Sequence, residues 1–215
     1  MRITVSRDGV VVVLPRRAAE RLAHEFVAER SGWIERSVAK LDAEAAVVAA
    51  RALCDGSAIP YLDDEMTLRL LGGDGGGERV RRAGAAGELC VRSADHSPAS
   101  IAALLERWYR RRAREEITRR LDVVVARNGT SYRRLAIRDQ RTRWGSCSTS
   151  GTLSFNWRLL LAPSVVLDYV VEHEAAHIEV RDHSPRFWAL LDRRVPGWQQ
   201  QRDWLRRHGG TLRLV

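Results

Sequence analysis

The chain has 215 residues, which is enough for one large domain or two small ones with a buried core. Hydrophobic residues make up 45% of it and charged residues 29%, no apolar run could span a membrane, and no signal peptide is evident, so we expect a cytoplasmic protein without a membrane segment. The net charge of +9 favours anionic partners. However, Lys40 is the single lysine, and such an arginine bias indicates genome composition more than phosphate contacts. Nucleic-acid binding is therefore not favoured.

The first fifty residues predict a hairpin followed by a long helical region. Arg2–Val5 and Val10–Leu14 flank Asp8-Gly9, a pair that is typical of a tight β-turn. From Arg17 to about Ala52, apolar residues recur at spacings of three, four and seven, with an interruption near Ser31-Gly32. This periodicity indicates helix over most of the region.

Two strand-like segments follow, Met66–Leu71 and Glu88–Arg92, and the glycine run 72–77 lies between them. A phosphate-binding loop would continue with Gly-Lys-Ser/Thr, and no such sequence follows, so we expect a hairpin with a flexible tip. A loose domain boundary is expected near residue 95. It would separate a strand- and helix-containing N-terminal region, residues 1–95, from a C-terminal domain, residues 96–215, that carries the chemistry.

A long helix is predicted from Pro98 to about Asn128, because apolar residues can line one side of it. Seven arginines cover the rest of its surface: Arg107, Arg110, Arg111, Arg112, Arg114, Arg119 and Arg120. Acidic residues alternate with them, which favours a solvated helix face, and a face that contacts nucleic acid is the alternative.

The remaining elements are predicted to be short. Arg134–Arg138 resembles a strand, and Pro163 can occupy the first turn of a helix whose apolar pattern continues into a cluster of histidines. The other predicted elements are a hairpin of Arg143–Cys147 with Thr152–Trp157, and two helices at Ser184–Val195 and Gly197–His208.

The most informative segment is the His-Glu-x-x-His motif at His173–His177. Positions four apart project from the same face of a helix, so His173 and His177 can direct two imidazole nitrogens to one ion. Glu174 is rotated about 100° from His173, so it can reach a water on that ion without coordinating the ion itself. The motif therefore predicts a hydrolytic metal site with Glu174 as the general base.

A catalytic zinc usually has three protein ligands, and the helix supplies two. His183 follows Arg181-Asp182, where the helix is expected to end, so we expect His183 as the third ligand. The spacing matches the extended metzincin pattern, except that Val180 occupies a position where that pattern has glycine. Three neutral imidazoles favour Zn²⁺, and Mn²⁺, Ni²⁺ or Co²⁺ can bind similar nitrogen ligands.

Several stretches around the motif resemble the YgjP-like metallopeptidase family, which is similar to the SprT-like and WLM zincin domains. They are Arg141–Cys147, Leu153–Leu159, Leu167–Val171 leading into His173–His177, and His183–Trp188. The resemblance spans roughly Trp108 to His208 and is weaker in the N-terminal half.

This resemblance implies an α+β fold: a minimal zincin-like domain with a long helix, a small sheet and a metal-bearing helix, preceded by a small β-rich N-terminal part. It also implies that His173, His177 and His183 are the metal ligands and that Glu174 is the catalytic residue. We expect Phe187 to pack beneath this site together with its neighbour in the sequence, Trp188.

The hairpin that precedes the metal-bearing helix is a candidate wall of the substrate cleft, because an edge strand offers unpaired backbone groups to an extended peptide. Arg143, Trp144 and Asn156 are the candidate substrate-binding residues. Arg143 or Arg141 can hold a carboxylate or phosphate through a bidentate contact, and Arg143 is a candidate donor to an oxyanion. The alternative is that Trp144 and Trp157 are core residues and that the arginines pair with local carboxylates.

Three functions are compatible with the sequence. We favour a zinc-dependent metallopeptidase that acts on a peptide or protein. The second is a phosphohydrolase that uses the same metal site, for example on nucleotides, because arginine suits phosphate. The third is a DNA-associated protease like the SprT-like proteins, which would bind DNA through the arginine-rich helix in a salt-sensitive manner. The sequence does not reveal the oligomeric state.

Overall fold

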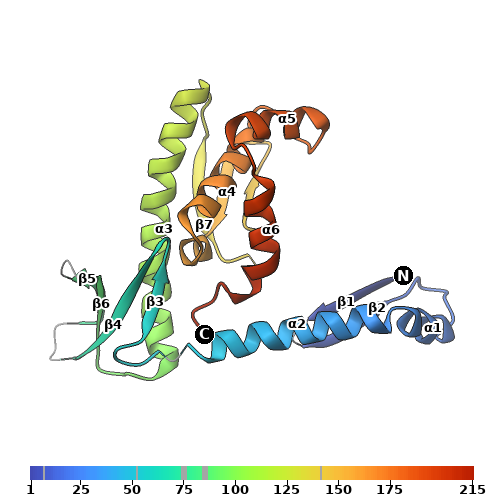
Figure 1. Cartoon of the computed structure of the whole chain (residues 1–215), viewed down its shortest axis with the longest axis horizontal. Coiled ribbons are helices and arrows are strands. Elements are labelled where there is room, and N and C mark those ends of the chain that lie inside the picture. Colours follow the sequence, from blue (N-terminus) through green and yellow to red (C-terminus); the bar gives the residue numbers. More distant parts are fainter. Residues whose placement is uncertain (7, 52, 74–76, 84–86, 141) are drawn as a thin grey trace. The chain divides into compact units, whose positions relative to one another are not determined.

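The computed structural model describes residues 1–6, 8–51, 53–73, 77–83, 87–140 and 142–215 (Figure 1). The fold is α+β, as the sequence predicts, with 49% helix and 23% strand. The chain forms two compact units, Met1–Ala50 and Arg51–Val215. The boundary expected near residue 95 falls inside the second unit, between a strand that ends at Ser93 and a helix that begins at Pro98.

The first unit consists of a hairpin and two helices. Strands β1 (Arg2–Ser6) and β2 (Gly9–Val13) pair in antiparallel orientation, as predicted. The predicted helical region is divided into α1 (Arg21–Glu29) and α2 (Ser31–Ala49), with the break at Arg30, close to the interruption in the sequence pattern. No helix within the described residues is both long enough and apolar enough to cross a membrane.

The second unit begins with a four-stranded sheet of β3 (Ala58–Tyr61), β4 (Asp64–Gly72), β5 (Arg79–Ala83) and β6 (Glu88–Ser93). The strand order is β3-β4-β6-β5, and β4 and β6 are parallel. The predicted hairpin between the β4 and β6 segments is therefore wrong. The segment between them contains β5, which pairs with β6 in antiparallel orientation and reverses the chain once more. Residues 74–76 of the glycine run lie outside the described residues.

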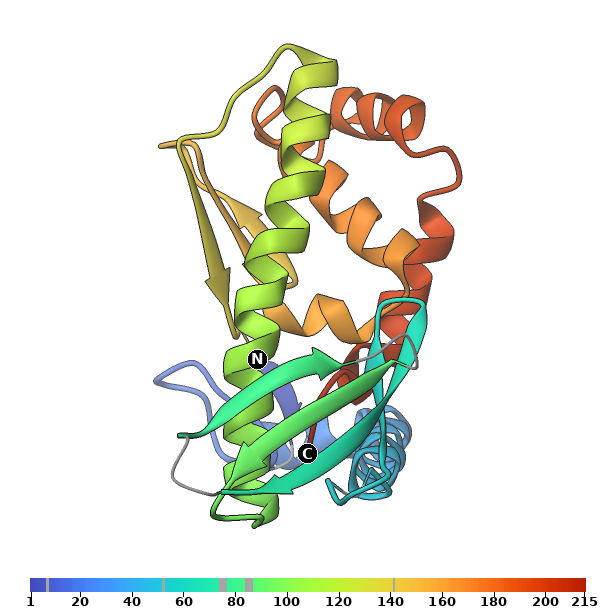
Figure 2. The same ribbon diagram turned by 90° about the vertical axis from the view of Figure 1, so that its left-hand side faces the viewer.

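Helix α3 (Pro98–Asn128) is the longest element of the described chain, and its bounds match the prediction. The Ser97 side chain accepts a hydrogen bond from the backbone N–H of Ser100 at its start, and Gly129 ends it in the left-handed conformation. Its apolar side is buried in the core of the unit. Figure 2 shows α3 passing the four-stranded sheet at its start and the C-terminal elements farther along.

A second, three-stranded sheet lies beside α3. Its strands are β7 (Arg134–Arg138), β8 (Gly145–Cys147) and β9 (Thr152–Asn156), in the order β7-β9-β8. The predicted hairpin is confirmed, since β8 and β9 are antiparallel. A 3-10 helix, η1 (Trp157–Leu161), follows β9 where the sequence predicts only the end of the strand. Strand β8 is one of the two edge strands, so one of its sides has no strand partner among the described residues.

Three helices complete the unit: α4 (Ser164–Ala176), α5 (Pro185–Arg194) and α6 (Gln199–His208). A short 3-10 helix, η2 (Gly209–Thr211), follows α6. Pro163 is the N-cap residue of α4 and not part of its first turn as predicted. Helix α4 contacts α3, β8, α5 and α6, so it is at the centre of the C-terminal elements.

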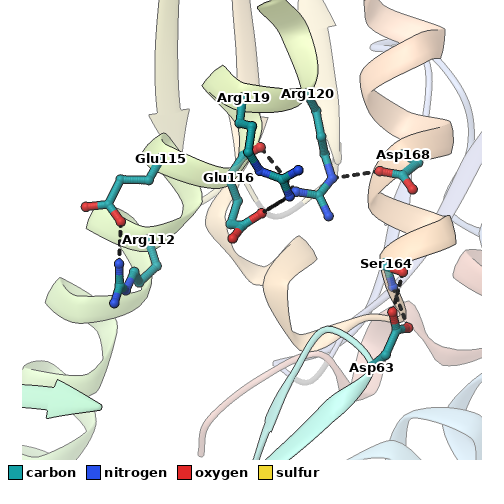
Figure 3. Close-up of polar contacts among 8 residues, drawn as sticks. All are labelled: Asp63, Arg112, Glu115, Glu116, Arg119, Arg120, Ser164 and Asp168. Atoms are coloured by element: carbon teal, nitrogen blue, oxygen red, sulfur yellow. Dashed lines mark hydrogen bonds and ion pairs between the residues drawn. The ribbon is translucent and has the colours of Figure 1, made fainter. Parts of the chain in front are cut away.

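Ion pairs cover much of the arginine-rich surface of α3 (Figure 3). Five of the seven arginines that the sequence singles out pair with a carboxylate: Arg107, Arg110, Arg112, Arg119 and Arg120. Nε of Arg120 also lies 2.6 Å from Asp168, which joins α3 to α4. These pairs favour a solvated helix face, and nucleic-acid binding through this helix stays a prediction.

Candidate metal centre

Three histidine side chains converge at the C-terminal end of α4. His173 lies in the last turn of the helix, His177 is its C-cap residue, and His183 lies two residues before α5. One potential ligand nitrogen from each ring lies within 4.8 Å of the others, and the Nε2 atoms of His173 and His183 are 3.1 Å apart. Two ligands of one tetrahedral zinc ion lie about 3.3 Å apart, so this spacing fits a shared divalent ion.

The chain turns sharply after α4 and so brings the third histidine back to the first two. The sequence predicts that the helix continues to Arg181-Asp182, but it ends at Ala176, and the Val180 N–H closes a further turn on the Ala176 carbonyl at 3.0 Å. Val180 makes this turn without a positive φ, so the glycine of the metzincin pattern is not needed here. The buried Val180 side chain instead joins the core.

Burial lowers the pKa of His173 and of His177 and so favours their neutral forms. Nδ1 of His177 donates to the Val180 carbonyl at 3.0 Å, which leaves its Nε2 as an acceptor. Burial, reinforced by the neighbouring His177 and His183, lowers the pKa of His173 to about 3. Nδ1 of His173 is buried without a partner in the described part of the chain. Because divalent metals bind the neutral imidazole, these donors fit such an ion at neutral pH.

Glu174 lies beside the histidines and is buried against β8. Burial raises the pKa of Glu174 to about 8, while the charge of Arg143 acts in the opposite direction. A carboxyl group with such a pKa is well matched to proton transfer near neutral pH. Gly145 permits the close contact, because a Cβ atom at this position would lie 2.5 Å from Cγ and 2.6 Å from Oε1 of Glu174.

Aromatic rings form the floor of the site. The fully buried Phe187 ring stacks on His177, with 4.4 Å between the ring centres and 22° between the ring planes. Trp188 stacks on His183 at 5.3 Å and 27°. The prediction that these two residues of α5 pack beneath the site is confirmed. Stacked rings allow an imidazole little freedom to rotate, so they help to fix the direction of its nitrogens.

A cavity of about 550 Å³ opens above the histidines. Strand β8 forms one wall with Gly145, Ser146 and Cys147, and α4 and α6 form others. The cavity is therefore bounded by an edge strand, the helix with the histidines, and a helix that carries arginines. A smaller cavity of about 220 Å³ adjoins it and shares Arg143, Trp144 and Leu205 with it.

The candidate substrate-binding residues occupy different environments. Arg143 and Trp144 line both cavities. Asn156 lines the smaller one, but it is almost fully buried and its amide is used internally, as donor to the Gln140 carbonyl and as cap of η1. Trp157 is buried in the core and its ring packs at an angle against that of Tyr109, and it lines neither of these two cavities.

Arg141 lies outside the described residues, so its position relative to the cavities is not described. Cys147 lines the larger cavity and is half-buried, where its thiol accepts a contact from Arg181 at 3.5 Å.

Several residues at the site have no signal in the sequence. Gly145 contacts Glu174, and Arg181, Arg202 and Arg206 line the larger cavity together with Tyr169. The two α6 arginines are separated from the histidine motif by a further helix, and no local pattern distinguishes them from the chain's many other arginines. Gly145 is part of the segment that resembles the family, but the residue that it contacts follows only from the fold.

The α+β fold, the three clustered histidines and the buried carboxylate beside them define a candidate metal-dependent hydrolase. The family model for the YgjP-like metallopeptidase domain matches residues 1–208, so the chain belongs to this family. The protein is therefore of the metallopeptidase class, which implies a metal cofactor and a peptide or protein substrate.

Other comparisons add little. No curated protein matches the chain. Among solved structures, the metallopeptidase zymogen of Pyrococcus abyssi abylysin is 21% identical, and the superposition covers 41% of this chain and 90% of that chain with a TM-score of 0.38.

Proposed function

We propose that this metallopeptidase is zinc-dependent, with His173, His177 and His183 as the metal ligands and Glu174 as the general base. The observation that carries the proposal is the convergence of three imidazoles, two of them with Nε2 atoms 3.1 Å apart, next to a buried carboxylate that lines the same cavity. A purely structural role would not require three histidines to bring their ring nitrogens together at a cavity.

Each residue has a distinct role in peptide hydrolysis. A bound divalent ion supplies Lewis acidity and acidifies water near neutral pH. Glu174 removes the proton from the attacking water and then delivers it to the nitrogen of the leaving amine. Arg143 lines the cavity, and in this proposal its guanidinium group would donate to the oxygen that becomes negative in the transition state.

Strand β8 is the proposed binding edge for the peptide. Within the described part of the chain it pairs with β9 alone, and its three residues line the cavity. An extended peptide that pairs with this free edge would run past the histidines and Glu174, and backbone hydrogen bonds would hold it independently of its side chains. Trp144, next to the strand, would then contact a substrate side chain.

Zinc is the preferred ion, because three imidazole ligands would hold it and would leave its fourth position open, as in catalytic zinc sites. Purified protein should contain one equivalent of metal, and chelation should abolish casein cleavage, with zinc restoring it.

Glu174→Gln should keep the metal and lose at least about a hundredfold in rate, as expected for a general base. Glu65→Gln, at an exposed residue of β4, is the control. Cleavage by Glu174→Gln at the wild-type rate would refute the assignment of the base.

A phosphohydrolase is the second candidate, and the observation in its favour is the charge of the cavity. Four arginines line it, Arg143, Arg181, Arg202 and Arg206, and their guanidinium groups suit phosphate as well as carboxylate. Nucleoside triphosphates and casein, each tested with and without chelator, separate the two. Turnover of nucleotides without proteolysis would favour this candidate over the peptidase.

A further inference from the structure

The charges around the larger cavity are strongly unbalanced. Among the described residues, its lining contains four guanidinium groups and one carboxylate, that of the buried Glu174. Two further acidic residues are close to these arginines. Asp203 lies 3.2 Å from Arg202 and 3.8 Å from Arg206, and Asp182 follows Arg181 in the sequence. The cavity mouth therefore keeps a positive potential at neutral pH, before any metal ion adds to it.

Two of the arginines lie at opposite ends of the free edge strand. Arg143 precedes β8 by two residues, and Nη1 of Arg181 donates to the carbonyl of Ser148, the residue that follows β8, at 2.8 Å. A peptide paired with β8 would therefore have a guanidinium group near each end of the paired segment. Both side chains also line the cavity.

The other two arginines face the cavity from α6. Arg202 and Arg206 are four residues apart, so they project from the same side of the helix. Arg202 is also held over the Trp198 ring, with its guanidinium carbon 5.0 Å from the ring centre. A guanidinium group that is already held in place loses less entropy when it binds an anion.

We propose that the cleft selects acidic peptides, with carboxylate side chains on both sides of the scissile bond, and that Arg143, Arg181, Arg202 and Arg206 recognise them. This inference rests on the proposed peptidase function and adds its substrate class. Arginine binds carboxylates through parallel N–H···O bonds, so the four groups would select charge as well as position. A neutral or basic peptide could still pair with β8 but would gain nothing from these residues.

Binding can be tested without turnover in the Glu174→Gln variant, with fluorescein-labelled peptides that are identical except for Glu, Gln or phosphoserine on either side of an Ala-Ala core. The Glu peptide should bind about tenfold more tightly than the Gln peptide at low salt, because each exposed ion pair contributes a few-fold. The difference should shrink at about 1 M salt, where the Debye length is about 3 Å. Equal dissociation constants for the Glu and Gln peptides would overturn the proposal, as would binding of the phosphoserine peptide alone.

Charge-removing variants assign the effect to residues. Arg202→Gln combined with Arg206→Gln should bring the preference for the Glu peptide over the Gln peptide toward one. This holds for the dissociation constants, measured with Glu174→Gln present, and for kcat/KM, measured with Glu174 intact. Arg207→Gln is the matched control, because Arg207 is an exposed arginine of α6 that does not line the cavity. An equal effect of Arg207→Gln would refute the assignment. If the protein binds acidic peptides selectively but the wild type does not cleave them, the peptidase function is refuted and the selectivity stands. If the wild type cleaves peptides without preference for acidic ones, the selectivity is refuted and the peptidase function stands.

Discussion

The carboxylate of Asp63 accepts hydrogen bonds from both the backbone N–H and the hydroxyl of Ser164, the first residue of α4 (Figure 3). Pro163, the N-cap residue, makes no side-chain cap of its own, so the cap comes from Asp63, 101 positions before Ser164. A negative charge at this end of a helix also interacts favourably with the helix dipole. The loop between β3 and β4 thus helps to fix the helix that carries His173.

Asp63→Ala should therefore lower the thermal unfolding midpoint. The hydrogen bonds from Ser164 lower the pKa of Asp63, so its contribution is complete above the ordinary aspartate pKa and is lost as the pH falls through the lowered value. The variant should accordingly differ from wild type at neutral pH and approach it in acid, measured by thermal unfolding at several pH values. Asp64→Ala is the control, because Asp64 pairs with Arg82 on the sheet and not with α4. An equal midpoint for Asp63→Ala and wild type at neutral pH would contradict the capping role.

Gly145→Ala should impair catalysis while leaving metal binding intact. A Cβ atom at this position would meet the Glu174 side chain at 2.5 Å, so the carboxyl group must move away from its position between α4 and β8. Loss of a positioned general base costs roughly a hundredfold or more in rate. Peptidase assays and metal analysis on the same sample check this. Gly72→Ala is the matched control, since a Cβ there meets no atom within 4 Å. An unchanged rate would show that Glu174 does not act from this position.

His183→Ala should make the thermal unfolding midpoint insensitive to removal of the metal. An ion that binds only the folded protein stabilises it by about 2.7 kcal/mol when its free concentration is about 100 times the Kd. Chelation should therefore lower the unfolding midpoint of wild type but leave that of His183→Ala nearly unchanged. His24→Ala, at an exposed histidine of the first unit, should respond to chelator as wild type does. A chelator response of His183→Ala as large as that of wild type would remove His183 from the ligand set.

Sequence reasoning identified the histidines because their chemistry depends on local spacing. Two positions four apart on a helix share a face whatever the rest of the fold does, so His173 and His177 could be predicted to lie together before their surroundings were known. The same holds for the bounds of α3, whose apolar periodicity and terminal glycine are local. The end of α4 was harder to predict, because the helix ends at Ala176 with no glycine or proline directly after it, and Val180 beyond it is buried in the core.

The features that sequence reasoning missed depend on contacts between distant segments. The parallel pairing of β4 with β6 requires β5, a short arginine-rich strand with little apolar character. Gly145 matters because of Glu174, 29 residues later in the sequence. Asn156 was expected to contact the substrate, but its side-chain amide forms hydrogen bonds with the backbone of Gln140 and of Arg158 in η1. The residue type does not show whether a polar side chain binds a ligand or satisfies buried backbone groups.

Arg127 and Glu172 form an ion pair that joins α3 to α4 next to His173, and its two members differ in burial. The Glu172 side chain is 9% exposed and that of Arg127 is 49% exposed. Arg127→Ala leaves a buried carboxylate without its partner, which should lower the free energy of unfolding by about 1–3 kcal/mol. We expect a value near the lower end of this range, because Arg127 is half-exposed and water weakens the ion pair. Arg111→Ala, at an exposed arginine of the same helix, should have little effect.

A double-mutant cycle separates the ion pair from the loss of arginine packing. Glu172→Gln removes the buried charge, so the double variant should recover most of the stability that Arg127→Ala loses. If the loss came from the packing of the arginine side-chain stem, the double variant would recover none of it. Denaturant unfolding of the wild type, the two single variants and the double variant gives the coupling energy. Strictly additive effects would mean that the pair contributes no interaction of its own and that Glu172 is stabilised by other groups around it.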